Sequence, residues 1–190
     1  LGGRDIEVVH SIISNEQGDL YVLGNTGSSN FPTTAGAFQK NFAGGNFQSS
    51  FAFNDYDFGS DIFIAKISND GSQLLHSTFW GGTGNDGFNE AIYKNYGDHY
   101  RGEIIIGEDG EILIVTSTNS LSIPLNGTNT LQRNENSQEA LVGVFDHQLS
   151  SLQWASFYGG TGAETGYSIK EYANKVYITG TTASDDLELS

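Results

Sequence analysis

The chain repeats one short phrase at a nearly constant spacing. Residues 79–84 read FWGGTG, residues 157–162 read FYGGTG, and the sequence opens with LGG. The residues that precede the three Gly-Gly pairs, Leu1, Trp80 and Tyr158, are 79 and 78 residues apart. Self-similarity at a fixed period is typical of proteins whose repeated units stack on one another. The sequence therefore predicts two full units, residues 1–80 and 81–158, and a partial third unit, residues 159–190.

Each unit has the pattern of short β-strands. Runs of five to eight residues are rich in β-branched and aromatic side chains, and Gly-rich or polar stretches separate the runs. We expect four strands in the first unit, four in the second and two in the third. The expected strands are 8–14, 20–25, 61–68 and 74–80, then 103–107, 111–118, 140–145 and 152–158, and finally 167–171 and 176–181.

Short strands in groups of four, with a Gly-rich motif at each repeat boundary, favour an all-β fold of the β-propeller type. In such a fold, four-stranded antiparallel blades surround a channel. The composition suits this class, with 25 glycines, only 2 prolines and 37% hydrophobic residues. We expect about two and a half blades, whereas a closed ring needs about four to eight. The chain is therefore predicted to be part of a longer propeller.

Composition also excludes several functional classes. The absence of cysteine rules out disulfides, thiolate metal sites and a cysteine nucleophile. A net charge of −15 repels phosphate backbones and anionic lipid heads, so we expect neither nucleic acid nor a membrane surface as a partner. No apolar run approaches the roughly 18 residues of a membrane span. The acidic surface suits divalent cations or neutral glycans.

The first unit resembles the SBBP repeat, a bacterial β-propeller repeat. The resemblance rests on residues 21–39 (YVLGNTGSSNFPTTAGAFQ), 60–75 (SDIFIAKISNDGSQLL) and 77–86 (STFWGGTGND). The second unit departs from this pattern at residues 122–132 and 140–146. The resemblance implies an exported or cell-surface bacterial protein whose parent chain carries further blades and sorting domains, and it implies no defined catalytic activity.

Two insertions interrupt the repeat and are rich in aromatic residues. They cover residues 40–58 in the first unit and residues 93–101 in the second. Exposed aromatic rings stack on sugar rings or bind protein partners, although the same rings could fold down as a local core. The predicted ligand-binding residues are Phe47, Phe51, Phe53, Tyr56, Tyr96 and Tyr100.

Residues 54–61 resemble the first half of a calcium-binding loop. Asp55, Asp57 and Asp61 alternate with other residues around Gly59, but Lys66 stands where a calcium loop needs its bidentate glutamate. Asp61 also opens an expected strand, which is a structural alternative. Calcium at these three carboxylates is therefore one alternative and a structural role of Asp61 is the other, and we expect no other cofactor.

Acidic residues also follow the Gly-Gly phrases. Asp86 and Glu164 occupy matching places, and Asp5 is the expected third member. Such carboxylates commonly accept backbone hydrogen bonds and fix a turn. Alternatively, a pair about 5 to 10 Å apart could act as acid and base on a glycan.

These patterns together predict a non-catalytic scaffold or adhesion module that binds a glycan or a protein partner at the cell surface through its loops. Two alternatives stay open. One is a glycan-cleaving enzyme with carboxylates at the channel mouth, and the other is a purely structural spacer.

Overall fold

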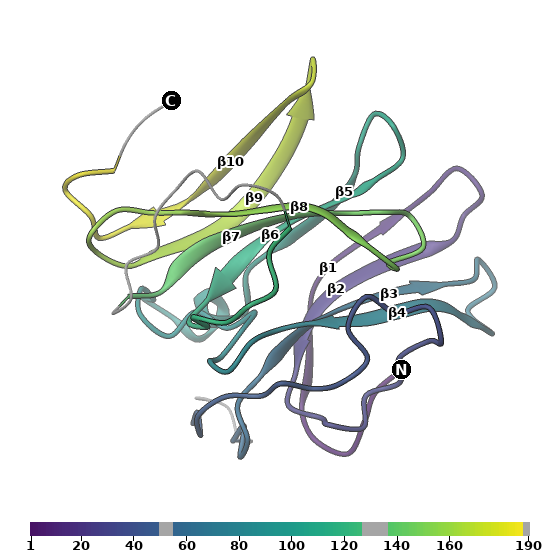
Figure 1. The fold of residues 1–190 in the computed structure, drawn as a ribbon, viewed down its shortest axis with the longest axis horizontal. Helices are drawn as coiled ribbons and strands as arrows, with labels where there is room; N and C mark the ends of the chain where they lie inside the picture. The colour runs from purple at the N-terminus through teal and green to yellow at the C-terminus, as the bar shows by residue number, and fades with distance from the viewer. Residues whose placement is uncertain (50–54, 127–136, 188–190) are drawn as a thin grey trace.

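The computed structural model describes residues 1–49, 55–126 and 137–187, and these form an all-β protein (Figure 1). The strands of the first unit are β1 (Glu7–Ser14), β2 (Leu20–Thr26), β3 (Asp61–Ile67) and β4 (Leu74–Trp80). Those of the second unit are β5 (Glu103–Ile106), β6 (Ile112–Thr118), β7 (Glu139–Phe145) and β8 (Leu152–Tyr158). The third unit supplies β9 (Glu164–Tyr172) and β10 (Lys175–Thr182), and a short 3-10 helix, η1 (Tyr96–Tyr100), precedes β5.

These strands form three antiparallel sheets in sequence order. The first is β1-β2-β3-β4, the second is β5-β6-β7-β8, and the third is the β9-β10 hairpin. All ten expected strands are present, and only β9 begins more than one residue from the expected position. The all-β prediction and the division into four, four and two strands are confirmed. No described residues form a helix long and apolar enough to cross a membrane.

The second sheet buries both of its faces, because the side chains of a strand point alternately to opposite sides. Ile112 and Ile114 of β6 belong to the largest core cluster, together with Trp80 of the first sheet. Leu113, between them, packs in a different cluster with Ile169 of the hairpin. The second sheet therefore lies between the first sheet and the hairpin, as Figure 1 shows.

The first strands of the three units are neighbours. β1 contacts β5, and β5 contacts β9. Blades that are arranged around an axis bring their innermost strands together in this way. The described residues do not close a ring, so the observed architecture is three adjacent sheets.

The outer face of the first sheet is covered by the segment that follows β2. Phe31 lies 4.5 Å from Phe63, and Phe42 lies 5.9 Å from Phe79, measured between ring centroids. These four rings form a separate buried or partly buried cluster. The segment that begins with residues 31–34 (FPTT) therefore covers β3 and β4.

Candidate functional site

Three Gly-Gly turns are built in the same way around a carboxylate. In each turn, the backbone N–H of the second glycine donates a hydrogen bond to the carboxylate four residues later. The pairs are Gly3 and Glu7 (3.1 Å), Gly82 and Asp86 (2.8 Å), and Gly160 and Glu164 (3.1 Å). A recurring geometry of this kind indicates a structural element of each unit.

The same carboxylates also accept hydrogen bonds from hydroxyl groups at the C-terminal end of the second strand of each unit. Thr26 donates to Glu7 at 2.9 Å, and Thr182 donates to Glu164 at 2.6 Å. Asp86 accepts hydrogen bonds from Thr118 and, at 2.6 Å, from Ser120. The turn-fixing interpretation of these carboxylates is thereby confirmed.

The expected third member of this set was wrong. Glu7, and not Asp5, matches Asp86 and Glu164, because only Glu7 lies four residues after the second glycine. The backbone N–H of Asp5 instead donates to Ser28 at 2.8 Å. The four-residue spacing between the second glycine and the carboxylate can be read from the sequence. The first unit, however, lacks the further glycine that follows the Gly-Gly pair in the other two units.

The three carboxylates predicted for calcium do not converge. Asp55 and Asp57 are exposed, and Asp55 accepts a hydrogen bond from Ser49 at 2.9 Å. Asp61 is fully buried and accepts hydrogen bonds from the backbone N–H groups of Ala43 (2.7 Å) and Gly44 (2.9 Å). Among the described residues, no group of three or more His, Asp or Glu side chains is arranged to hold a metal ion.

Asp61 makes stability depend on pH. Burial, with a smaller contribution from the charge of Asp86, raises the pKa of Asp61 to about 8, although its backbone hydrogen bonds act in the opposite direction. An acid with a raised pKa in the folded state contributes stability at low pH that is lost as the pH rises toward that pKa. We therefore expect the free energy of unfolding to fall between pH 6.5 and 8, by up to about 1.4 kcal/mol per pH unit from this group.

The measurement is urea unfolding at several pH values, with Asp61→Asn as the comparison. The variant should lack this part of the decline. The range above pH 6.5 avoids His10, whose pKa is lowered to about 4 by burial and which therefore changes stability at lower pH. Equal slopes for the two proteins above pH 6.5 would contradict the assignment.

The two aromatic insertions meet in one cluster, which we call the loop cluster. It consists of Tyr56 from the first insertion and of four residues from the segment that joins β4 to β5, namely Phe88, Tyr93, His99 and Tyr100. Phe88 is central, with ring centroids 5.7 Å from Tyr56, 5.0 Å from His99 and 5.3 Å from Tyr100. Tyr93 lies 4.1 Å from His99. Segments that are more than 30 residues apart in sequence therefore share one packed set of rings.

The predicted ligand-binding aromatic residues have different environments. Tyr96 is 73% exposed and Phe47 is 59% exposed, while Tyr100 is half-buried. Tyr56 is fully buried, and its hydroxyl accepts a hydrogen bond from Asn25 at 3.0 Å. The ring of Tyr56 therefore packs as core in this structure, and its predicted contact with a ligand stays a prediction that the burial does not favour. The predicted residues Phe51 and Phe53 lie outside the described residues.

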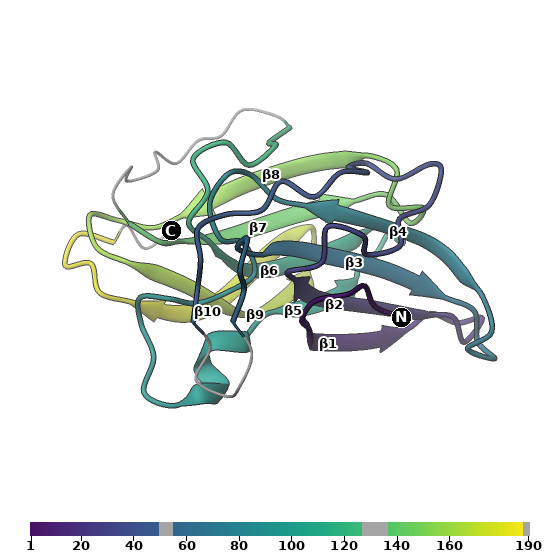
Figure 2. The same ribbon diagram turned by 90° about the horizontal axis from the view of Figure 1, so that it is seen from below.

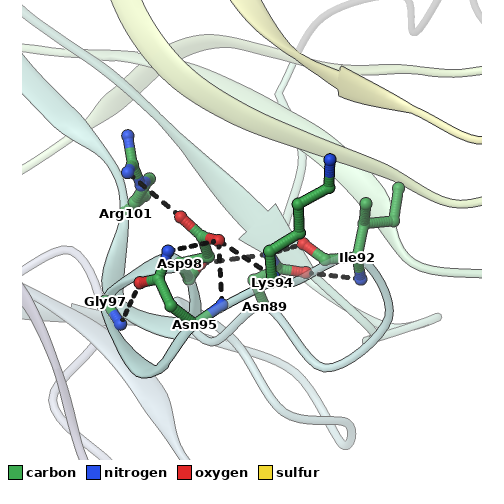
Figure 3. A network of polar contacts seen from close by, with 7 residues as sticks. All are labelled: Asn89, Ile92, Lys94, Asn95, Gly97, Asp98 and Arg101. Carbon is green, nitrogen blue, oxygen red and sulfur yellow. Dashed lines mark hydrogen bonds and ion pairs between the residues drawn. The ribbon is translucent and has the colours of Figure 1, made fainter.

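Helix η1 is held by reciprocal capping and projects from one side of the sheets (Figure 2). Asn95 caps the helix and accepts a hydrogen bond from the N–H of Gly97 at 2.9 Å. Asp98 accepts hydrogen bonds from the N–H groups of Lys94 (3.0 Å) and Asn95 (3.3 Å), and Figure 3 shows this arrangement. A capping box of this kind satisfies backbone donors that a short helix leaves open. The backbone that carries Tyr96 is thus fixed before any ligand arrives.

Asn89 joins the η1 segment to the sheets. Its side chain donates to the carbonyl groups of Ile92 (2.5 Å) and Asp98 (3.1 Å) and accepts from the N–H of Ile92 at 3.1 Å (Figure 3). Gln138, just before β7, donates to Asn89 at 2.8 Å and to the carbonyl of Glu164 at 2.9 Å. This chain of hydrogen bonds anchors the loop to the second sheet and the hairpin.

We expect Asn89→Ala to loosen this loop. The substitution removes a buried side chain and leaves partly buried backbone carbonyls of Ile92 and Asp98 without their partner, which costs about 2–3 kcal/mol in total. Urea unfolding measures the loss, and hydrogen exchange should be faster at residues 92–99. Asn95→Ala is the matched control, because Asn95 is exposed and loss of a cap costs about 1 kcal/mol. Equal effects of the two substitutions would contradict the anchoring role of Asn89.

Arg101 forms the exposed margin of this site. Its guanidinium lies 3.0 Å from Asp98 and 4.9 Å from the ring centroid of Tyr167 in β9. An arginine held by a carboxylate and stacked on an aromatic ring has a restricted orientation. It therefore offers directed N–H groups at the C-terminal end of η1. The sequence placed Arg101 in the second insertion, but it did not predict the contact with Tyr167, because Tyr167 lies in the next unit.

A concave surface lies between the first two sheets, beside the turns that join β1 to β2 and β5 to β6. This cleft has a volume of about 490 Å³ and is lined by residues that include Tyr21, Lys66, Glu108 and His147. Lys66 pairs with Asp19 at 3.3 Å, and Tyr21 donates to the carbonyl of His147 at 2.9 Å. The ammonium group of Lys66 and the hydroxyl group of Tyr21 are therefore already engaged within the protein.

Comparisons with known proteins identify no family. No protein-family model matches the chain, and no curated protein matches it. What is established is an all-β protein that consists of two four-stranded antiparallel sheets and a hairpin.

Proposed function

We propose that this chain is a non-catalytic binding module that contacts a glycan or a protein partner through the exposed rings of Tyr93 and Tyr96, which residues 93–101 carry beside the buried part of the loop cluster. The observation that carries the proposal is the anchored η1 segment, which presents Tyr96 at 73% exposure on a backbone fixed by Asn89, Asn95 and Asp98. A contact surface that is ordered before binding loses little conformational entropy when the partner arrives.

The chemistry of the exposed residues supports this function. Tyr93 is 44% exposed and Tyr96 is 73% exposed, and Phe58 of the first insertion is 71% exposed. Tyrosine offers a large apolar ring with a polar tip and few rotatable bonds, which suits it to sugar and protein surfaces. The neighbouring guanidinium of Arg101 adds hydrogen-bond donors.

We further propose that the sheets are blades of a longer propeller of the SBBP type in an exported or cell-surface bacterial protein. The neighbouring first strands and the three equivalent Gly-Gly turns support repeated blades. The remaining blades and the sorting domains of a longer chain would then be the covalent partners of this segment. The proposal of export rests on the resemblance of residues 21–39 and 60–86 to that repeat.

The glycan-cleaving alternative has less support. It assigned acid and base roles to Asp86 and Glu164, which are 0% and 2% exposed and whose oxygens bind glycine N–H and hydroxyl groups. A general acid must reach the bond that it protonates. The spacer alternative leaves the exposed tyrosines without a role.

The test is binding of the chain to a panel of cellulose, xylan, chitin, laminarin, pectin and alginate, and to whole bacterial cells. We expect at least one surface to retain the chain. Replacing Tyr93 and Tyr96 together by Ser should weaken that binding by about 10-fold or more, since a stacked aromatic contact is commonly worth about 1–2 kcal/mol.

Tyr172→Ser is the matched control for this experiment. Tyr172 is 71% exposed but lies at the far end of β9, away from η1. The control should bind as the unchanged chain does, and both variants should keep the thermal midpoint. Retention that is unaffected by the double substitution would exclude the loop cluster as the binding surface.

A further inference from the structure

We propose that the second insertion, residues 93–101, recognises the carboxylate groups of an acidic glycan built from uronic acid sugars. The guanidinium of Arg101 and the ammonium of Lys94 would bind the carboxylates, next to the sugar rings that stack on tyrosine. This inference rests on the binding function proposed above, because it names the kind of glycan that the same loop would take. The preference for acid is nevertheless a separate claim and has its own test.

The first observation is the local charge of the second insertion. The chain as a whole has 8 basic and 23 acidic side chains, but the insertion contains Lys94 and Arg101 against a single acidic residue, Asp98. Interactions between exposed charges that are more than about 8 Å apart are largely screened at physiological ionic strength. An anionic ligand that reaches the insertion therefore meets a local excess of positive charge.

The carboxylates nearest to the insertion are already bound within the protein. The side chain of Asp98 is 13% exposed and accepts hydrogen bonds from the backbone N–H groups of Lys94 and Asn95. Glu90 and Glu103, which lie on the two sides of the insertion in sequence, are half-buried and also accept hydrogen bonds from protein groups. These carboxylates therefore present little negative charge to a ligand.

The second observation is that Arg101 is held on two sides and still reaches solvent. Its guanidinium lies 3.0 Å from the carboxylate of Asp98 and 4.9 Å from the ring centroid of Tyr167, yet its side chain is 49% exposed. A guanidinium has five N–H donors in a planar fork that matches the two oxygens of a carboxylate. Arg101 can therefore hold Asp98 and bind a second carboxylate at its exposed side.

A β-bulge brings Tyr167 to Arg101. The pairing of β9 with β10 passes from Ser168 directly to Gly166, so Tyr167 is an extra residue without an opposite partner in the ladder. β1 has the same bulge at His10, and in both strands the extra residue lies three positions after the carboxylate of the Gly-Gly turn. A bulge redirects a side chain, and bulges are common beside functional sites.

The two bulges fix the end of the insertion from two different units. The ring of His10, in the first unit, lies 6.5 Å from the ring of Tyr100. The ring of Tyr167, in the third unit, contacts Arg101, the next residue along the chain. A group that is positioned before the ligand arrives loses less conformational entropy on binding. The bulge residues therefore pre-organise Arg101, although neither of them needs to touch the ligand.

Lys94 and the exposed tyrosines complete the argument for a sugar acid. Lys94 is exposed, and Figure 3 shows the side chains of Lys94 and Arg101 on either side of Asp98. Tyr96, between these basic residues in sequence, is 73% exposed. Uronic acids combine a ring face for tyrosine with a carboxylate for arginine or lysine, whereas an acidic peptide offers the carboxylate alone. The observations therefore favour an acidic glycan over an acidic peptide.

The experiment compares polygalacturonate with its fully methyl-esterified form in a calcium-free buffer. The two polymers have the same sugar rings and differ in the charge of their carboxyl groups. We expect the whole chain to bind the acidic polymer about 10-fold or more tightly, because charged hydrogen bonds are about twice as strong as neutral ones. Arg101→Gln should remove most of this preference. Lys175→Gln, which removes an equal charge at the start of β10, should keep it.

Tyr167 is a positioning residue, and two variants test this role. Tyr167→Phe keeps a ring beside the guanidinium and should keep the preference for the acidic polymer. Tyr167→Leu removes the cation–π contact and should lower the preference about 3-fold or more. Both variants should keep the thermal midpoint. Equal preferences in the two variants would contradict the positioning role.

The outcomes separate this inference from the function on which it rests. Equal binding of the two polymers, weakened in both cases by joint replacement of Tyr93 and Tyr96, would overturn the acid preference and leave the proposed function standing. Absence of binding to these polymers and to the whole panel would overturn both. An unchanged preference in Arg101→Gln would overturn the assignment of Arg101. Polyglutamate bound as tightly as polygalacturonate would assign the site to an acidic protein segment instead.

Discussion

Asp86→Ala is expected to lower the free energy of unfolding by about 3–5 kcal/mol. Asp86 is 0% exposed, and its carboxylate accepts hydrogen bonds from the N–H of Gly82 and from the hydroxyl groups of Thr118 and Ser120. Removal of the carboxylate leaves these buried donors unsatisfied, and each unsatisfied group costs about 1–3 kcal/mol. Urea unfolding, monitored by far-UV circular dichroism, measures the loss.

Glu7→Ala is the matched control for this prediction. Glu7 performs the same role in the first unit but is only partly buried, so water can replace the lost acceptor. Its loss should cost about 1 kcal/mol. A cost for Asp86→Ala no larger than that of Glu7→Ala would show that the buried turn between the first two sheets does not depend on its carboxylate.

Trp80→Ala is expected to cost about 3–5 kcal/mol, the range for truncation of a buried aromatic side chain. Trp80 is 0% exposed and lies 5.3 Å from Phe145 in an edge-to-face arrangement across the contact between the first two sheets. Its indole N–H also donates to the carbonyl of Pro124 at 2.9 Å. The substitution therefore opens a cavity at that contact.

The chain supplies its own control in Trp154, its second tryptophan. Trp154 lies in β8 and is 39% exposed, so Trp154→Ala should cost less than about 1 kcal/mol. Guanidinium unfolding of both variants compares the two directly. Similar costs would contradict the packing of the first sheet against the second through Trp80.

The sequence was sufficient to predict the strands, because their order and length are local properties. The repeated phrases before Gly81 and Gly159 marked the unit boundaries, and β-branched runs marked the strands between them. It was also sufficient to predict that Asp86 and Glu164 fix a turn. Local hydrogen bonds over four residues follow from spacing alone.

The candidate site was predicted only in part, because it depends on contacts between distant segments. The exposed position of Tyr96 agrees with a binding role, but nothing near Tyr56 in sequence shows that Phe88 and Asn25 enclose it. Asn89 was missed for the same reason, since its partner Gln138 is 49 residues away. A buried asparagine has no sequence pattern of its own.

The most direct measurement of the central claim is a map of backbone amide shifts as the chain is titrated with the polysaccharide that the binding panel selects. We expect the largest shift changes at residues 93–101, which carry the exposed ring of Tyr96, and at residues 55–58. Changes that fall instead on the cleft beside Lys66 and His147 would contradict it, as would the absence of binding to every member of the panel.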